Sequence, residues 1–168
     1  MVLKKFTRLS ILLSLSVALN VIEASIPLLN GFIPGLKIGL ANIVTLFVIY
    51  KFNFKDALYL GILRVLLVGM LRTGIFSTTF FFSLSGVVLS VIFMTLGKKY
   101  INLSIIGVSI LGSIGHCIGQ VITAIIILQN NAMFYYLPWL LIFSIPTGIL
   151  VGLIGKQLIT YYDDNFID

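Results

Sequence analysis

Residues 103–128 read LSIIGVSILGSIGHCIGQVITAIIIL, a stretch of sequence without a single Asp, Glu, Lys or Arg. An α-helix of this length extends about 39 Å, which exceeds the roughly 30 Å hydrocarbon core of a bilayer. The stretch is therefore long enough to cross a membrane with some tilt. It predicts a transmembrane helix and with it the class of the whole fold.

The composition of the full chain agrees with a membrane protein. Of its 168 residues, 60% are hydrophobic and only 10% are charged, and the mean hydropathy is +1.17. Soluble domains are about 45–50% apolar and about 25% charged. The composition excludes a soluble enzyme, a disordered protein and a disulfide scaffold, since Cys117 is also the only cysteine. A net charge of +6 could indicate nucleic acid in a soluble protein, but here we expect no nucleic-acid partner.

Five further apolar segments resemble the first one. We expect an all-α membrane protein, a six-transmembrane-helix bundle that forms a single domain over residues 1–168. The second segment is short, so it is expected to begin in an irregular stretch around Pro34 and Gly35, where proline and glycine disfavour helix. The six spans are predicted at residues 9–29, 38–50, 57–71, 80–96, 103–128 and 138–161.

The basic residues are distributed unevenly between the two ends of these spans. With the amino terminus in the cytoplasm, eight of the 11 Lys and Arg side chains lie inside, Lys37 and Arg72 lie outside, and Arg64 lies within the third span. This bias predicts that both termini are cytoplasmic. It also places Tyr135, Tyr136 and Trp139 at the outer end of the sixth span, where an aromatic belt is expected. The eight inner residues are Lys4, Lys5, Arg8, Lys51, Lys55, Lys98, Lys99 and Lys156.

Four charged side chains are expected in or beside the outer half of the membrane, where such groups usually face a cavity or a partner. Glu23 lies roughly 22 Å along the first helix from Arg8. Lys37, Arg64 and Arg72 oppose this single carboxylate, so a pocket lined by all four would suit a carboxylate or phosphate group. Alternatively, Glu23 pairs with one arginine and holds the first and third spans together, which leaves two cations for a ligand.

Uncharged polar residues extend the same predicted pocket. Asn42 follows Lys37 by about one turn, and His116, Gln120 and Thr123 share one helix face. The start of the second span would direct backbone N–H groups toward the pocket, which again favours an anion. A lone histidine in a span is more often an interhelical hydrogen-bonding residue than a metal ligand, so we expect no metal and no cofactor.

Small residues recur at helical spacing in three spans. Such a stripe lets a second helix approach closely. The stripe in the first span could face a partner subunit, whereas those in the fifth and sixth spans indicate packing inside the bundle. The first stripe is Ser10, Ser14 and Ala18, and the others are Gly112, Gly115 and Gly119, then Gly148 and Gly152.

Catalytic motifs are missing from the sequence. It has no Walker A, HExxH or CxxC pattern, and one histidine cannot support a triad argument. Asp163, Asp164 and Asp168 have DDxxxD spacing, which differs from the DDxxD magnesium motif of prenyl diphosphate synthases. We expect a solvated acidic tail and no catalysis by this chain alone.

Residues 34–42, PGLKIGLAN, resemble the signature of a bacterial membrane family known as Gx transporter proteins or heptaprenyl diphosphate synthase component I. Arg64, the segment FSLSG at 82–86 and the segment from Gly115 to Gln120 add weaker support. The resemblance extends over nearly the whole chain.

That family is similar to the substrate-binding S components of energy-coupling-factor (ECF) transporters. The resemblance implies a multi-pass protein of the bacterial cell membrane that takes up a small anionic molecule through an outward-facing pocket. Its partners would be an ECF transmembrane scaffold and ATPase subunits, with Ser10, Ser14 and Ala18 as the docking face. The candidate substrate-binding residues are Lys37, Asn42, Arg64, Arg72, Glu23, His116 and Gln120.

The synthase name leaves a second hypothesis open. The chain could be a non-catalytic membrane subunit associated with a prenyl diphosphate synthase subunit, or with quinone or flavin electron-transfer systems. A self-contained secondary transporter is disfavoured, because the six spans show no clear inverted repeat.

Overall fold

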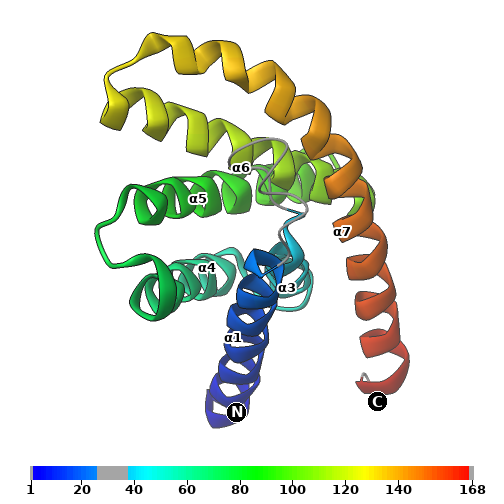
Figure 1. The fold of residues 1–168 in the computed structure, drawn as a ribbon. Coiled ribbons are helices and arrows are strands. Elements are labelled where there is room, and N and C mark those ends of the chain that lie inside the picture. The colour runs from blue at the N-terminus through cyan, green and yellow to red at the C-terminus, as the bar shows by residue number, and fades with distance from the viewer. Residues whose placement is uncertain (1, 26–37, 167–168) are drawn as a thin grey trace.

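The computed structural model describes residues 2–25 and 38–166, and every regular element in these ranges is a helix (Figure 1). A π-helical turn, η1 (Gly69–Thr73), continues α4, and a 3₁₀ turn, η2 (Asn131–Tyr136), precedes α7. The α-helices of the described ranges follow the order of the predicted spans. They are α1 (Val2–Ala24), α3 (Leu40–Lys51), α4 (Phe54–Val68), α5 (Thr78–Lys99), α6 (Ile105–Leu128) and α7 (Leu137–Phe166).

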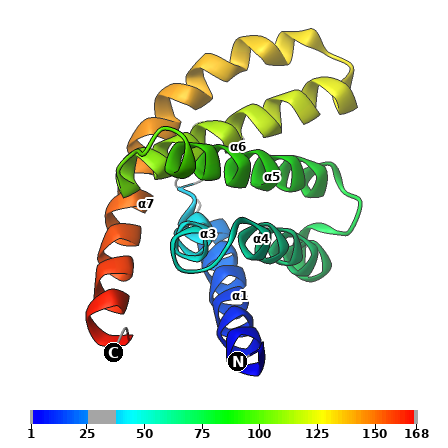
Figure 2. The ribbon, with the colours of Figure 1, turned by 180° about the vertical axis from the view of Figure 1, so that it is seen from behind.

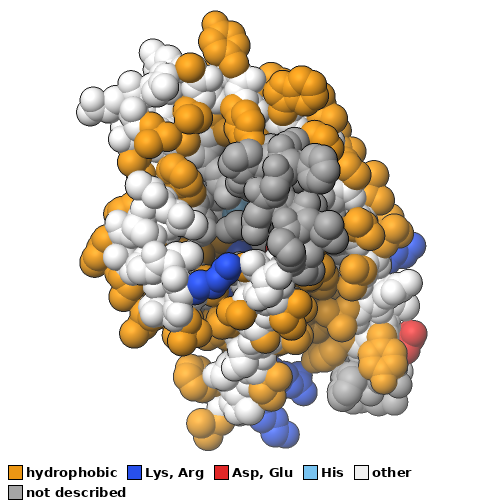
Figure 3. Space-filling view, viewed as in Figure 1, with side chains coloured by type: hydrophobic (Ala, Val, Ile, Leu, Met, Phe, Trp, Pro, Cys, Tyr) orange, Lys and Arg blue, Asp and Glu red, His pale blue; other side chains and the backbone are white. Residues whose placement is uncertain are grey.

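Four helical segments of the described ranges are long and apolar enough to cross a membrane. They are Leu3–Ala24, Thr78–Lys99, Ile105–Leu128 and Asn131–Asp164. Hydrophobic side chains cover much of the visible surface in Figure 3, as expected for a protein surrounded by lipid. The chain is therefore an all-helical protein with four candidate membrane-spanning helices among the residues described.

The short helix α3 lies at the centre of the bundle. Residues 41–49 are all buried, and α3 contacts α1, α4, α5, α6 and α7. Its side chains Val44, Leu46 and Val48 are fully inaccessible. A helix that is apolar on every side is stable only when other elements surround it. The span that the sequence predicted to be short is thus α3, the most enclosed helix.

Glycines set the spacing of α5, α6 and α7. A Cβ atom on Gly119 would lie 2.6 Å from the carbonyl oxygen of Ser85, and one on Gly148 would lie 2.8 Å from the Cα of Ile110. The neighbour in each case is backbone, which cannot rotate away. The prediction that the glycines of the fifth and sixth spans serve internal packing is confirmed.

Several predicted boundaries differ from the observed ones. α1 begins at Val2 rather than residue 9, because a helix can continue through basic residues beyond its apolar part. α4 begins at Phe54, three residues early, since Asn53 and Asp56 form a capping box. It ends at Val68, and the predicted end at residue 71 falls within η1. The predicted irregular stretch around Pro34 and Gly35 lies outside the described residues.

Charged residues gather at one end of the bundle, which we call the basic end. Both termini lie at this end in Figures 1 and 2. The contacts there involve the N-terminal parts of α1 and α4 and the C-terminal parts of α3, α5 and α7. They are the ion pairs Lys5–Asp56 at 2.8 Å and Lys51–Asp163, the hydrogen bond from Arg8 to the hydroxyl of Tyr162 at 2.9 Å, and that from Lys98 to the carbonyl oxygen of Ile49 at 2.7 Å.

The predicted solvated acidic tail is only partly solvated at Asp163, whose side chain is 41% exposed. This carboxylate pairs with Lys51 on α3, so it holds the last turns of α7 against the centre of the bundle. Tyr162 reinforces the contact with its ring against Phe47, at a centroid distance of 5.3 Å. Asp168 lies outside the described residues.

Candidate functional site

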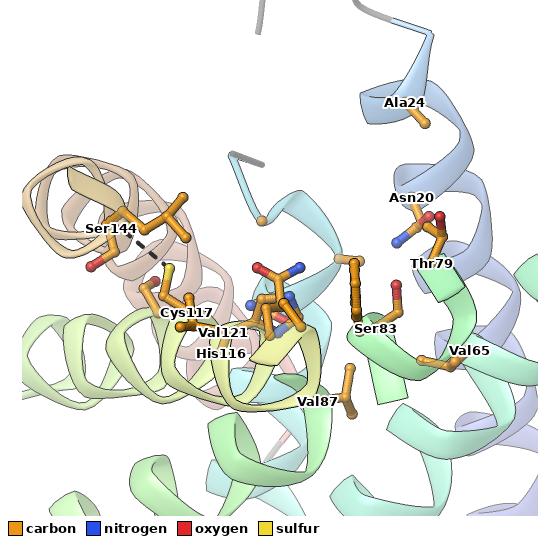
Figure 4. A pocket seen from close by; sticks show the side chains of 18 of the residues that line it. Asn20, Ala24, Val65, Thr79, Ser83, Val87, His116, Cys117, Val121 and Ser144 are labelled. Atoms are coloured by element: carbon orange, nitrogen blue, oxygen red, sulfur yellow. Dashed lines mark hydrogen bonds between the residues drawn. The ribbon is translucent and has the colours of Figure 1, made fainter. Parts of the chain in front are cut away.

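A cavity of about 1070 Å³ opens at the end of the bundle opposite the basic end. Its lining comes from the C-terminal parts of α1 and α4, the N-terminal parts of α3, α5 and α7, the C-terminal two thirds of α6, and both η1 and η2. Figure 4 shows Asn20 and Thr79 on one side of this space, with His116, Cys117 and Ser144 across from them. Helices far apart in the sequence therefore line the same cavity.

One side, which we call the charged wall, consists of the lining residues of α1, α3, α4 and η1. It contains Glu23, which is 6% exposed. The Glu23 carboxylate accepts hydrogen bonds from the backbone N–H groups of Gly39 at 2.7 Å and Leu40 at 3.1 Å. Gly39 has a φ of 83°, a left-handed conformation that glycine adopts without strain. Glu23 therefore acts as the negatively charged cap of α3.

This cap changes the prediction that the start of the second span offers free N–H groups to an anion. The N–H groups of Gly39 and Leu40 do point toward a negative charge, but that charge belongs to the protein. The carboxylate is covalently held nearby, so it reaches these donors at no cost in association entropy. An external anion would have to bind elsewhere on the charged wall.

Arg64 on α4 offers such a place. Its side chain is 3% exposed, with Nη1 donating to the Ser16 hydroxyl and Nη2 to the Asn42 side-chain oxygen, both at 3.4 Å. Its Nε has no hydrogen-bond partner among the described residues. The two bonds present are longer than usual for a guanidinium. Arg64 thus keeps donor capacity beside the cavity that it lines.

Among the described residues, no ion pair within 4 Å joins Glu23 to an arginine. The Glu23 carboxylate instead binds the backbone N–H groups of Gly39 and Leu40. The alternative in which Glu23 holds α1 and α4 together through a direct ion pair is therefore not observed. A buried charge without a close counter-ion is costly.

Arg72 lies at the exposed edge of the charged wall. Its Nη2 donates to the carbonyl oxygen of Ala24 at 3.0 Å, which ties η1 to the C-terminal end of α1. A cation at a helix C-terminus is favourable because the unpaired carbonyl groups carry partial negative charge. Lys37, the third predicted cation of the pocket, lies outside the described residues.

The other side, which we call the uncharged wall, consists of the lining residues of α6, η2 and α7. It contributes no Asp, Glu, Lys or Arg to the described lining. Trp139 is 59% exposed and Tyr135 is 82% exposed. The sequence predicted these aromatic residues as a belt at the membrane surface and missed that they line a cavity. Hydropathy cannot separate the two roles, because both place an aromatic ring at the end of a span.

His116 and Gln120 lie on the face of α6 that the sequence predicted. His116 packs against α5, where a Cβ on Gly86 would come within 2.7 Å of its ring. Cys117, expected on another face, also lines the cavity, and its thiol lies 3.9 Å from the Leu140 carbonyl oxygen. Thr123 is not among the lining residues, although it was expected there.

The difference on α6 follows from the direction of its cavity face. At about 100° per residue, Gln120 lies about 40° and Cys117 about 100° to one side of His116, whereas Thr123 lies about 20° to the other side. The cavity lies on the side of His116 that Gln120 and Cys117 occupy, and α5 covers the side that Thr123 occupies. The sequence gives the spacing of these residues but not the direction of the neighbouring helix.

Six of the seven predicted substrate-binding residues line the cavity. Their role in binding a substrate stays a prediction. Hydroxyl side chains on α5, α6 and α7 also line it and were not predicted. Serine and threonine are common in membrane helices, so their presence alone gave no signal. The six are Asn42, Arg64, Arg72, Glu23, His116 and Gln120, and the additional residues include Thr79, Ser113, Ser144 and Thr147.

The stripe of Ser10, Ser14 and Ala18 lies on the exposed face of α1. The Ser14 hydroxyl donates to the Ser10 carbonyl oxygen at 3.1 Å, so it requires no outside partner. Ile11 and Leu15, which lie to one side of the stripe, are also exposed. Its use as a docking face stays a prediction.

Comparison with known proteins identifies a family. A family model described as heptaprenyl diphosphate synthase component I matches residues 12–158, which is most of the chain. No curated protein and no solved structure matches the chain.

Proposed function

The chain belongs to the heptaprenyl diphosphate synthase component I family, and we propose that it is the substrate-binding membrane subunit of an ECF-type transporter for a small anionic molecule. One observation carries the proposal. The buried guanidinium of Arg64 lines a large cavity without an ion pair to any described residue. Such a group is costly in the empty protein and gains most from an anion that enters the cavity.

The proposed orientation places the basic end in the cytoplasm of a bacterial cell, with six spans and both termini inside. The positive-inside rule supports this, because Lys5, Arg8, Lys51 and Lys98 lie at that end. The cavity would then open outward. Arg72, at the exposed edge of the charged wall, would attract an anion before it reaches Arg64.

In the proposed cycle, Arg64 binds the anion and Asn42 adds a hydrogen bond, while Glu23 holds α3 in place. The loaded protein then reorients in the membrane as an ECF scaffold and its ATPase subunits change conformation. The scaffold would dock on the stripe of Ser10, Ser14 and Ala18. The chain itself catalyses no reaction in this proposal.

Native mass spectrometry of the protein, purified gently from its own cells, tests the proposal. We expect a small anionic ligand on the wild-type protein together with scaffold and ATPase subunits. The Arg64→Gln variant should lose the ligand and keep the subunits, since its docking stripe is unchanged. The Ser14→Leu variant should keep the ligand and lose the subunits. A wild-type protein that carries neither ligand nor ATPase subunits would contradict the proposal.

The family description favours a second candidate, a non-catalytic membrane subunit that anchors a prenyl diphosphate synthase subunit. The basic end could bind an acidic surface of such a soluble partner. The same spectra separate the two candidates. A co-purifying synthase subunit with an empty cavity would support the anchor and contradict the transporter.

A further inference from the structure

We propose that the cavity ligand is an amphipathic anion, with one anionic group on the charged wall and an apolar body along the uncharged wall. This inference rests on the proposed function in that it assumes the cavity holds a ligand. It goes further by naming the chemical class of that ligand from the two walls.

The first argument is the separation of charge. Glu23, Arg64 and Arg72 are the charged residues of the described lining, and all three belong to the charged wall. Arg64 is the one that is both buried and short of hydrogen-bond acceptors. Within the described lining, a ligand therefore meets fixed positive charge on the charged wall only, and its anionic group would lie against that wall.

The second argument concerns Glu23. A free carboxylate in the cavity could bind an amine and would select a zwitterion or a cation. Glu23 is 6% exposed, and both of its oxygens accept hydrogen bonds from the start of α3. An amine would have to reach a 6% exposed carboxylate and share its oxygens with the cap of α3, so the described lining favours a ligand without a positive group.

The third argument is the size and surface of the rest of the cavity. A volume of about 1070 Å³ lies just above the range for small-molecule sites, roughly 300–1,000 Å³. A simple inorganic anion would leave most of this space and the whole uncharged wall without contact. That wall offers accessible apolar area through Ala124, Leu128 and Trp139, which an apolar body would remove from water.

The protein carries its own reporter for a test. Trp139 is the only tryptophan of the chain and lines the uncharged wall. Its fluorescence in lipid nanodiscs can be titrated with ethyl, butyl, hexyl and octyl phosphate, with empty nanodiscs to correct for partitioning into lipid. Inorganic phosphate, octanol and octyltrimethylammonium serve as matched probes that lack the tail, lack the charge or reverse it.

We expect the affinity to rise roughly fourfold with each added methylene that becomes buried. Octyl phosphate should bind more tightly than inorganic phosphate, octanol and octyltrimethylammonium. Arg64→Gln should weaken octyl phosphate binding by about tenfold or more and leave octanol binding unchanged. Arg64→Lys, which retains the charge, should weaken it less. Leu128→Asn on the uncharged wall should reduce the gain per methylene while ethyl phosphate binds as before.

Equal affinities for inorganic and octyl phosphate, or tighter binding of octyltrimethylammonium, would overturn the inference without any variant having to fold. If none of the phosphates changes Trp139 fluorescence while native mass spectra show a bound ligand, the ligand class is wrong and the proposed function stands. If those spectra show no ligand and no transporter subunit, the proposed function itself fails.

Discussion

The two walls of the cavity are built differently. On the charged wall, Glu23 and Arg64 are 6% and 3% exposed and contact α3 or α1 through hydrogen bonds. On the uncharged wall, Trp139 and Tyr135 are 59% and 82% exposed. The charged groups are thus held in place by hydrogen bonds to their neighbours, whereas more than half of each aromatic side chain is exposed. Such a cavity would hold the charged group of a ligand in a fixed position and leave the rest of the ligand less tightly enclosed.

The walls also differ in what supports them. The charged wall depends on side-chain hydrogen bonds to the start of the central helix α3. The uncharged wall depends on close helix packing, in which Gly119 and Gly148 meet the backbones of α5 and α6. Substitutions in the charged wall should therefore act through lost hydrogen bonds, whereas substitutions behind the uncharged wall should act through disrupted helix packing.

Removal of the α3 cap should have the largest effect. In Glu23→Ala the N–H groups of Gly39 and Leu40 lose their acceptor, and we expect the free energy of unfolding to fall by about 3–4 kcal/mol. Glu23→Gln keeps one acceptor oxygen and should cost about half as much. Thermal unfolding in nanodiscs measures both. Equal stability of Glu23→Ala and the wild type would show that the cap does not hold the charged wall.

Arg64→Met should separate ligand binding from stability. We expect octyl phosphate binding to weaken by about 50- to 100-fold, or about 2–3 kcal/mol, because the buried cation is lost. The free energy of unfolding should stay equal or rise, since methionine is similar in length and removes an unpaired buried charge. Calorimetric titration and thermal unfolding measure the two quantities. A large loss of stability would instead make Arg64 a structural residue.

Gly119→Ala should test the support of the uncharged wall. A methyl group there would meet the Ser85 carbonyl oxygen at 2.6 Å and force α5 and α6 apart. We expect a loss of about 2 kcal/mol in the free energy of unfolding. Gly107→Ala, whose Cβ would lie 3.2 Å from the Leu103 Cβ, is the matched control and should cost much less. Similar unfolding temperatures for the two variants would argue against the close packing.

Trp139→Ala should affect binding more than folding. We expect the affinity for octyl phosphate to fall by about five- to tenfold, or about 1 kcal/mol, because an exposed ring contributes only part of its area to a ligand. Calorimetry measures this without the fluorophore. Tyr59→Ala on α4 is the control, since Tyr59 is 68% exposed and does not line the cavity. The comparison of the walls fails if both variants bind equally well.

Ser14→Leu should have the smallest effect on the isolated protein. Ser14 lies on the exposed face of α1, away from both walls, so stability should change by less than about 0.5 kcal/mol and ligand binding should be unaltered. Co-purification of partner subunits should nevertheless be lost. Ile11→Leu on the same face preserves volume and should retain them. Normal assembly of Ser14→Leu would remove the stripe as the docking face.

Much of the site could be predicted because polar residues in apolar spans are conspicuous. Asn42, Arg64, His116 and Gln120 stand out in the sequence, and all four line the cavity. The hydrogen bonds of Glu23 could not be predicted in the same way. Its partners are backbone N–H groups, which every residue except proline carries, so no residue type in the sequence identifies them.

The sequence by itself determined which segments are helical, and four of the six predicted spans correspond to helices of the described ranges that are long and apolar enough for a membrane. The physical reason is that bilayer thickness and backbone hydrogen bonding act on each segment separately. Only the tertiary structure decided that α3 is the enclosed helix, that Thr123 turns away from the cavity and that Trp139 faces it. These outcomes depend on the direction in which each helix face points toward its neighbours, and that direction is fixed by packing between segments far apart in the chain.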